Sequence, residues 1–252
     1  MHISLSQQTI LVTGGSRGIG RAIVRRLAAS GATVAVQYGQ SKAAAESLQS
    51  EFPEQVHVFQ ADFRKPDAPW QLAEQVLNQL GQIDGLVNNA GIALEMPTKA
   101  NSQEWQTQWE TTLQVNLIAT AALCRAFLPT FQQQQQGRIV HISSRAAFRG
   151  DTVDYLAYAA SKGGMVALSR SLARGYGKMG IKSFVVAPGF IRTEMAQQFI
   201  DTYGEAWVLD DLALNKLTEP EDVAPTVEFL LSGLMDHATG CTIDINAGSY
   251  VH

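Results

Sequence analysis

The sequence is poor in cysteine and has no clusters of positive charge. Cys124 and Cys241 are its only cysteines, far apart and without a Cys-x-x-Cys pair, so neither a disulfide framework nor a thiolate metal site is indicated. The five histidines share no spacing typical of metal ligands, and we expect no metal. The 19 lysines and arginines are scattered and the formal net charge is −4, so the chain shows no basic stripe for a nucleic-acid backbone.

Targeting signals are also missing from the sequence. The amino-terminal residues lack the basic flank and apolar run of a signal peptide, and we expect no stretch that spans a membrane. Hydrophobic residues make up 46% of the chain and charged residues 17%, which is ordinary for a globular protein. These features predict a cytoplasmic protein with neither a membrane nor a nucleic acid as its partner.

Residues 9–20, TILVTGGSRGIG, predict a strand, a tight turn and the start of a helix. Glycines in the turn let backbone N–H groups approach a phosphate, and the positive end of the helix dipole favours the same anion. The spacing of Gly14, Gly18 and Gly20 differs from the usual G-x-G-x-x-G, and such a turn can also be only a turn. The same letters fit the G-x-S-x-G elbow of serine hydrolases, but too little chain precedes Thr9 to build an oxyanion hole.

Strand-like and helix-like segments alternate along the whole chain. Strands are expected at residues 9–12, 33–38, 55–62, 84–89, 138–144, 181–189 and 241–246, with helices between them. Such alternation predicts an α/β fold: a single Rossmann-type domain over residues 1–252, with a doubly wound, seven-stranded parallel sheet and helices on both faces. Residues 190–217 lack the alternation and are expected to be an insertion that covers the substrate.

Three details of the helices are expected. Pro129 should disturb or end a helix that runs from Trp105 to Phe131, because proline lacks a backbone N–H. The glutamines from Gln132 to Gln136 should be a solvated helix end. Thr218 should cap a helix that has Pro220 in its first turn.

Tyr158 and Lys162 stand four residues apart on an expected helix, so their side chains share a face. A neighbouring ammonium lowers the pKa of a phenol, which makes tyrosine usable as an acid or base near neutral pH. Taken alone, this spacing shows only that the two residues share one face of a helix. The spacing supports a site because residues 88–91 come after the fourth expected strand, Ser143 and Ser144 end the fifth, and Pro188 and Gly189 end the sixth. Ligands bind at the carboxyl ends of parallel strands.

At this point the sequence resembles the short-chain dehydrogenase/reductase family over its full length. The matching pieces are residues 13–20, Asp62, residues 88–91, Asn116, Ser144, Tyr158 with Lys162, and Pro188-Gly189 with Thr193. The resemblance implies hydride transfer between NAD(P) and a carbonyl or secondary alcohol. It also implies a homotetramer that uses the long helices and the carboxyl-terminal strand.

The resemblance also implies the roles of the catalytic residues. Tyr158 would protonate the carbonyl oxygen, Lys162 would lower the phenol pKa and hold the nicotinamide ribose, and Ser144 would hydrogen-bond the substrate oxygen. Asn116 would keep a water in a proton relay behind Lys162. The cofactor would lie against Gly14, Ser16, Arg17, Gly18, Ile19, Gly20, Tyr38, Asp62, Asn89, Ala90, Gly91, Tyr158, Lys162, Pro188, Gly189, Ile191 and Thr193. Asp62 would touch the adenine, residues 88–91 would line the cleft and Thr193 would meet the carboxamide.

The cofactor is expected to be NADP rather than NAD. Relatives that use NAD carry an acidic residue at the end of the second strand, where it repels a 2′-phosphate, and this chain has Tyr38 there. Arg17 and Lys42 could reach the phosphate, although both could also be solvated surface cations.

The substrate is less defined. Residues 185–195 and the segment after Pro220 are most similar to 3-oxoacyl-carrier-protein reductases, and sugar or polyol dehydrogenases are almost as similar. Carrier-protein users present basic residues where this chain has Gln135 and Met179, so an acidic carrier finds little to bind. Arg145 and Arg149 flank Ser144 and either meet an anionic small substrate or are solvated.

We therefore expect an NADP-dependent ketone reductase that acts on a 3-oxoacyl thioester or a small ketone. A sugar or polyol dehydrogenase is the alternative within the family, and a protein that binds NADP without turnover is the alternative of another class. Aromatic and apolar residues recur every fourth position in the insertion, which indicates either closure over the substrate or ordinary helix packing. These residues are Met195, Phe199, Tyr203 and Trp207.

Overall fold

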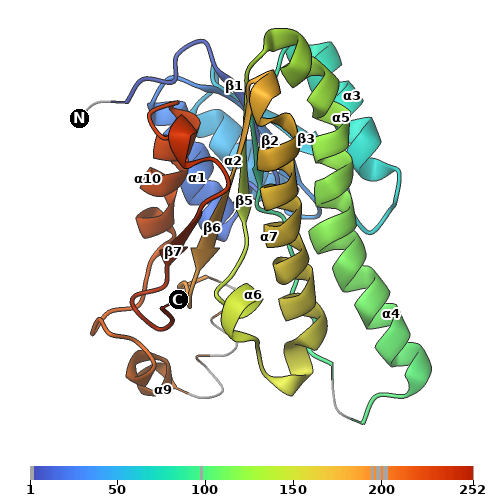
Figure 1. Ribbon diagram of the computed structural model, residues 1–252, viewed down its shortest axis with the longest axis vertical. Helices are drawn as coiled ribbons and strands as arrows, with labels where there is room; N and C mark the ends of the chain where they lie inside the picture. Colours follow the sequence, from blue (N-terminus) through green and yellow to red (C-terminus); the bar gives the residue numbers. More distant parts are fainter. Residues whose placement is uncertain (1–2, 97–98, 194–195, 197–199, 201–203, 252) are drawn as a thin grey trace.

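A seven-stranded parallel sheet forms the centre of the protein in a computed structural model that describes residues 3–96, 99–193, 196, 200 and 204–251 (Figure 1). The strands lie in the order β3-β2-β1-β4-β5-β6-β7. Their bounds are β1 Thr9–Val12, β2 Thr33–Tyr38, β3 Val56–Gln60, β4 Gly85–Asn88, β5 Gly137–Ile142, β6 Ile181–Pro188 and β7 Thr242–Ile245. The expected doubly wound fold is confirmed.

Helices cover both faces of the sheet (Figure 1). One face packs against α1 Gly18–Ala29, α2 Lys42–Glu51 and α10 Pro220–Leu231. The other packs against α3 Ala68–Leu80, α5 Ala119–Gln134 and α7 Leu156–Tyr176. Side chains alternate between the two cores along each strand, so that Ile10 and Val12 lie in the first and Leu11 in the second.

The strand order reverses at β1, which pairs with β2 on one side and β4 on the other. Leu11 is opposite Ala35 in one neighbour and Leu86 in the other. Crossover helices that leave in opposite directions open a crevice at the carboxyl ends of β1 and β4. The residues expected to bind ligands follow these strands and their neighbours β5 and β6.

The helix that contains Pro129 is longer than expected. α4 Ser102–Leu113, a π-helical turn over Gln114–Ile118 and α5 form one run that ends at Gln134, and Pro129 lies inside it. Of the two expected outcomes, a disturbed or an ended helix, the structure excludes the second, because the packing of α5 through Phe127 and Phe131 continues past the missing N–H. Residues Gln133 to Gln136 are exposed, as expected for a solvated end.

The run Ser102–Gln134 is also long and apolar enough, by length and composition, to cross a membrane, with mean hydropathy 1.3. We did not expect such a stretch from the sequence. Half of its apolar window is buried inside the protein, as in the core helix of a packed domain, and one such helix is weak evidence for a membrane span.

The cap of α10 is Glu219 and not Thr218. Glu219 and Asp222 form a capping box in which the Glu219 N–H donates to the Asp222 carboxylate at 2.8 Å. Thr218 is buried and its backbone instead bridges to Ile191. Pro220 stands in the first turn of α10, as expected.

Three shorter elements complete the described part of the chain near the site. They are α6 Ala146–Arg149, a 3-10 turn over Val153–Tyr155, and α9 Glu205–Asp210. Within the segment 190–217, Ile200, Val208 and Leu217 form a small separate core. Met195, Phe199 and Tyr203 of the aromatic repeat lie outside the described residues.

Candidate active site

The loops after β1 and β4 are held together by one threonine and one asparagine. The backbone N–H groups of Asn89 and Ala90 donate to the Thr13 hydroxyl, both at 3.0 Å. Asn89 donates through Nδ2 to the carbonyl oxygens of Thr13 and Gly14, at 2.8 and 3.1 Å. The glycine turn and the loop after β4 therefore form one hydrogen-bonded unit at the switch point of the sheet.

Two glycines of the turn are required by close packing. Gly14 has φ +61°, a left-handed conformation, and a Cβ there would lie 2.9 Å from the Cα of Ala90. A Cβ on Gly20 would collide with the carbonyl oxygen of Gly14. Helix α1 can therefore approach the turn, and its amino terminus faces the crevice.

A buried glutamine that the sequence reasoning missed supports the same turn. Gln37, on β2, accepts the Gly14 N–H at Oε1 and donates through Nε2 to the Ala61 carbonyl, both at 2.7 Å. Its backbone carbonyl accepts the Gly15 N–H at 3.0 Å. A polar residue in the apolar strand TVAVQY was the signal that could have identified it.

Ser144, Tyr158 and Lys162 lie together beyond the end of β5. The Tyr158 phenol is hydrogen-bonded to Ser144, and the Ser144 Oγ also accepts the Ala146 N–H at 3.1 Å. The Lys162 Nζ lies 5.7 Å from the centroid of the Tyr158 ring. Ser144 is thus the serine next to the tyrosine, whereas the Ser143 hydroxyl donates to the backbone carbonyl of Lys162 at 3.0 Å.

The ionisation of this group differs from the expectation. Burial raises the pKa of the Tyr158 phenol, the hydrogen bond to Ser144 opposes the rise, and the charge of Asp151 adds to it. Burial lowers the pKa of Lys162 to about 8, and its Nζ donates to the Ile142 carbonyl at 2.8 Å. The expected net lowering of the phenol pKa is therefore wrong for this structure, because desolvation of the phenol dominates.

Asn116 lies at the centre of the π-helical turn and is fully buried. Its Nδ2 donates to the Ile92 carbonyl and to the Ser161 hydroxyl, both at 2.9 Å, and its Oδ1 accepts the Ile92 N–H at 2.8 Å. Ser161 in turn donates to the Tyr158 carbonyl at 2.7 Å. Asn116 thus ties the loop after β4 to the catalytic helix, and π-helical turns are frequent at functional sites.

The amino terminus of α1 fits a phosphate group. No acidic side chain and no side-chain cap hydrogen bond occurs in the first turn of α1, all of whose residues are described. The N–H groups and the dipole there suit an anion such as a pyrophosphate. Thr193 lies opposite Gly18, where a Cβ would be 3.3 Å from the Thr193 methyl carbon. Thr193 therefore packs directly against the glycine turn.

The other residues expected at the cofactor lie around the same edge. Ser16 is buried in the turn, Arg17 and Ile19 border it, and Tyr38 is the buried last residue of β2. Pro188 ends β6, and a Cβ on Gly189 would lie 2.7 Å from the Asn246 backbone. Ala90 and Gly91 are half-buried after β4, with Gly91 next to Asn116 and Lys162. The structure therefore brings these positions to one side of the sheet.

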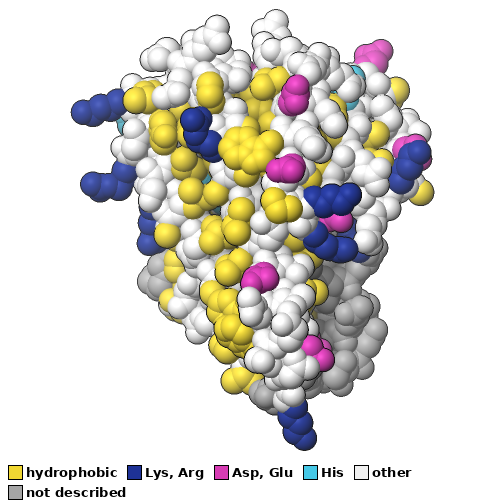
Figure 2. All heavy atoms as spheres, turned by 90° about the vertical axis from the view of Figure 1, so that its right-hand side faces the viewer, with side chains coloured by type: hydrophobic (Ala, Val, Ile, Leu, Met, Phe, Trp, Pro, Cys, Tyr) yellow, Lys and Arg dark blue, Asp and Glu magenta, His cyan; other side chains and the backbone are white. Residues whose placement is uncertain are grey.

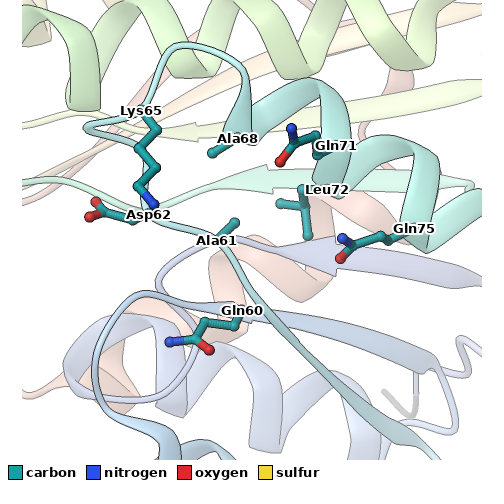
Figure 3. Close-up of a pocket in the computed structure, with 8 residues that line it drawn as sticks. All are labelled: Gln60, Ala61, Asp62, Lys65, Ala68, Gln71, Leu72 and Gln75. Atoms are coloured by element: carbon teal, nitrogen blue, oxygen red, sulfur yellow. The ribbon is translucent and has the colours of Figure 1, made fainter.

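Asp62 lies at the border of a hollow next to β3. The hollow has a volume of about 330 Å³ and lies between the end of β3 and α3 (Figure 3). Its lining consists of Gln60, Ala61, Asp62, Lys65, Ala68, Gln71, Leu72 and Gln75. The Asp62 carboxylate accepts the Arg64 N–H at 3.1 Å. Polar amides around a shallow apolar floor suit a heteroaromatic ring such as adenine.

Asn88 was expected to line the cleft together with residues 89–91, and the structure places it elsewhere. Asn88 is buried, and its Nδ2 contacts Cys124 Sγ at 3.5 Å and His141 Nδ1 at 3.4 Å. Burial and the charge of Lys162 lower the pKa of His141 to about 3. His141 is therefore neutral at pH 7.

Comparison with known proteins agrees with this geometry. The family model described as short chain dehydrogenase matches residues 8–204. The 3-oxoacyl-[acyl-carrier-protein] reductase of Aquifex aeolicus is 33% identical over 253 residues, which covers 99% of this chain and 100% of that protein.

Two solved structures are similar along nearly the whole chain. A putative gluconate dehydrogenase from Agrobacterium tumefaciens superimposes with a TM-score of 0.91 at 26% identity, with 100% of each chain covered. A blue fluorescent protein from a metagenomic library, solved in complex with NADPH, has a TM-score of 0.87 at 35% identity, with 98% of this chain and 100% of that chain covered.

Proposed function

The chain belongs to the short-chain dehydrogenase family and is an NAD(P)-dependent oxidoreductase that acts on carbonyl or hydroxyl groups, and from this premise we propose that it is an NADP-dependent ketone reductase. The observation that carries the proposal is the grouping of Ser144, Tyr158 and Lys162 beyond β5, next to the glycine turn. When bound, the nicotinamide cofactor supplies or accepts the hydride.

In this proposal Tyr158 acts as general acid. Its hydroxyl donates a proton to the carbonyl oxygen in reduction and takes it back in oxidation. A raised phenol pKa suits the acid role, because the group stays protonated in the resting protein. The Ser144 hydroxyl donates a hydrogen bond to the same substrate oxygen and stabilises the charge that develops there.

Lys162 and Asn116 act behind the tyrosine. With a pKa of about 8, Lys162 is mostly protonated at pH 7 and its ammonium favours the phenolate formed after proton donation. Asn116 positions the helix turn that carries Tyr158 through Ser161 and keeps a water near Lys162 for proton return.

NADP is the proposed cofactor. β2 ends at Tyr38 and no acidic residue occurs in the sequence from Tyr38 to Lys42, so a carboxylate that would repel a 2′-phosphate is missing at that position. The solved relative in complex with NADPH supports this choice. Arg17, in the glycine turn at the N-cap of α1, is the proposed partner of the 2′-phosphate.

The substrate is proposed to be a small ketone or a 3-oxoacyl thioester, in line with the reductase relatives. A carrier protein is a weaker candidate. Met179 is exposed where carrier users have a basic residue, and Arg138 is buried against Asp236, with which it forms two hydrogen bonds of 2.7 and 2.9 Å. A sugar dehydrogenase is the second candidate, favoured by the similarity to a putative gluconate dehydrogenase.

We also propose that residues 1–252 form one domain, that residues 190–217 cover the substrate, and that the protein is a cytoplasmic homotetramer. Apolar side chains gather on the face formed by α4 and α5 (Figure 2). Trp105 is 47% exposed and packs against Trp109 with tilted rings whose centroids are 5.2 Å apart, and Ile118 is 52% exposed. Apolar helical surface of this kind suits burial against a second copy of the chain.

Replacing Tyr158 by phenylalanine tests the proposal. We expect kcat for ketone-dependent NADPH oxidation to fall by about 10² to 10⁴-fold, because the proton donor is lost, while NADPH still binds. Tyr155→Phe is the matched control, since Tyr155 lies one turn earlier and outside the catalytic group. Unchanged turnover in Tyr158→Phe would refute the assignment. NADPH binding without turnover of any ketone or alcohol by the wild type would instead favour the NADP-binding protein without catalysis.

A further inference from the structure

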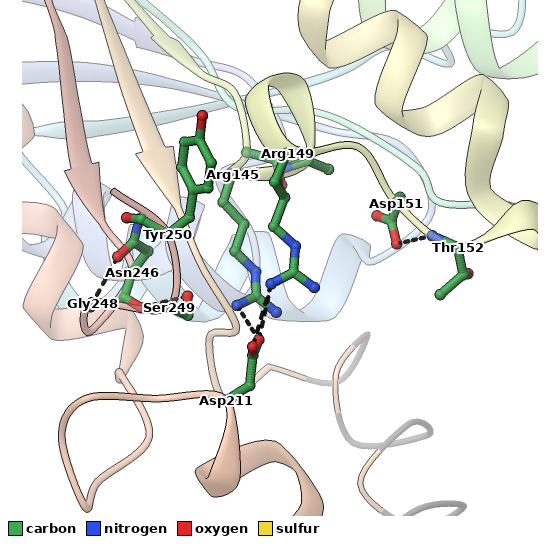
Figure 4. A network of polar contacts seen from close by, with 11 residues as sticks. Arg145, Arg149, Asp151, Thr152, Asp211, Asn246, Gly248, Ser249 and Tyr250 are labelled. Atoms are coloured by element: carbon green, nitrogen blue, oxygen red, sulfur yellow. Dashed lines mark hydrogen bonds and ion pairs between the residues drawn. The ribbon is translucent and has the colours of Figure 1, made fainter. Parts of the chain in front are cut away.

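Two arginines next to the catalytic serine converge on a single carboxylate (Figure 4). Arg145 Nη1 lies 2.6 Å from Asp211 Oδ2, and Arg149 Nη1 lies 3.1 Å from the same oxygen. Arg145 is the N-cap of α6, which follows β5, and Arg149 is its last residue, whereas Asp211 directly follows α9. The three groups therefore come from segments more than 60 residues apart in the sequence.

Two guanidinium groups share the Asp211 carboxylate in this cluster. A second carboxylate, Asp151, also acts on Arg145 through its charge and accepts the Thr152 N–H at 2.8 Å. The Arg145 side chain is only 14% exposed, and burial and the charge of Arg149 lower its pKa. Asp211 is 40% exposed and is therefore screened by water. A mostly buried guanidinium beside a second one favours a further, better-shielded anion.

The cluster borders the reacting groups. Arg145 follows Ser144 in the sequence, and its N–H donates to the Pro188 carbonyl at 2.9 Å. The charge of Asp151 acts on both the Arg145 guanidinium and the Tyr158 phenol. Phe148, which precedes Arg149 in α6, stacks its ring on that of Tyr250 with centroids 6.4 Å apart. A ligand held by the arginines would thus lie close to the proposed carbonyl site.

We propose that Arg145 and Arg149 bind a carboxylate of the substrate, which takes the place of Asp211, so that the enzyme acts on oxo acids and the matching hydroxy acids. This inference rests on the proposed roles of Ser144 and Tyr158. Guanidinium groups recognise a carboxylate through paired, charge-assisted hydrogen bonds, and the Asp211 side chain already occupies that position. In the substrate-free protein Asp211 is an internal competitor that keeps both arginines in place.

Matched pairs of ketones test the inference. The probes are 3-oxobutanoate, 4-oxopentanoate and 5-oxohexanoate, each beside its methyl ester, with NADPH oxidation as the readout. We expect wild type to prefer at least one acid over its ester in kcat/KM. In Arg149→Gln this acid-to-ester ratio should fall by about tenfold to a hundredfold through KM, the loss expected for a charge-assisted hydrogen bond. In Asp211→Asn the KM for the acid should fall, because the competitor is gone.

Controls separate recognition from a structural role. Arg25→Gln removes an arginine from the surface pair with Glu51, where its side chain is 49% exposed against 39% for Arg149, and the acid-to-ester ratio of this variant should equal that of wild type. Arg145→Lys keeps the positive charge but loses the planar pair of guanidinium N–H donors. The acid-to-ester ratio should therefore fall, with little change in the free energy of unfolding. Equal losses for acids and esters in Arg149→Gln and Asp211→Asn would show that the cluster only braces the fold and would overturn the inference.

Thermal unfolding with each probe provides a readout that does not need turnover. Stabilisation by an acid but not by its ester, lost in Arg149→Gln, supports the carboxylate site. If this pattern occurs while no probe is reduced, the proposed reductase function fails and the anion site stands. Preference for a coenzyme A thioester over every free acid would assign the arginines to a phosphate and would overturn the inference.

Discussion

Replacing Gln37 by methionine tests whether one buried amide holds the glycine turn. Gln37 pairs with the N–H of Gly14 and the carbonyl of Ala61, both at 2.7 Å. Methionine has a similar length and pairs with neither, so a donor and an acceptor are left unpaired at about 1 to 3 kcal/mol each. We expect the free energy of unfolding to fall by about 2 to 6 kcal/mol. This is a large share of the roughly 5 to 15 kcal/mol by which a typical domain is stable.

The assay is urea unfolding followed by circular dichroism, with the midpoint and the slope fitted separately. Gln60→Met is the matched control, because the Gln60 amide also donates to a backbone carbonyl, that of Gly39 at 3.1 Å, but at an exposed position. This control should change the stability by no more than about 0.5 kcal/mol. A titration of NADPH fluorescence should show weaker binding in Gln37→Met, since the turn loses its support from β2.

A loss below about 1 kcal/mol in Gln37→Met would refute the reasoning. It would mean that water or a shifted backbone replaces both partners. Lost stability with unchanged NADPH affinity would refute the functional half alone, because the turn would then keep its shape without the amide.

Three further predictions concern other parts of the fold. His141 has its pKa lowered from 6.5 to about 3, so the unfolded chain binds one more proton between these values and stability falls with falling pH by up to about 1.4 kcal/mol per unit. His141→Asn should flatten that part of the stability curve measured by urea unfolding at several pH values, and an unchanged slope would contradict the cause. Asp222→Ala removes the acceptor of the Glu219 N–H and should cost about 1 kcal/mol, visible as a lower Tm, whereas an unaltered Tm would argue against the capping box. Arg17→Gln should raise the Kd for NADPH about tenfold and leave that for NADH unchanged in fluorescence titrations, and equal effects on both would assign Arg17 to the shared pyrophosphate.

The sequence by itself determined the architecture and the order of the reacting residues. Apolar strands alternating with amphipathic helices leave few topologies other than a doubly wound parallel sheet, and the four-residue spacing of Tyr158 and Lys162 places them on one helix face. The glycine turn was predictable because close backbone approach excludes a Cβ at Gly14 and Gly20. These features depend on local geometry, which a short stretch of chain already contains.

Only the tertiary structure decided what depends on distant neighbours. Pro129 stays inside a helix because the core on both sides holds it, and Gln37 becomes a support for the turn through partners on other segments. Burial, rather than the nearby ammonium, decides the direction of the Tyr158 pKa. The meeting of Arg145 and Arg149 with Asp211 could not be derived from spacing. Desolvation and long-range contact are set by the packed chain as a whole, so no local pattern encodes them.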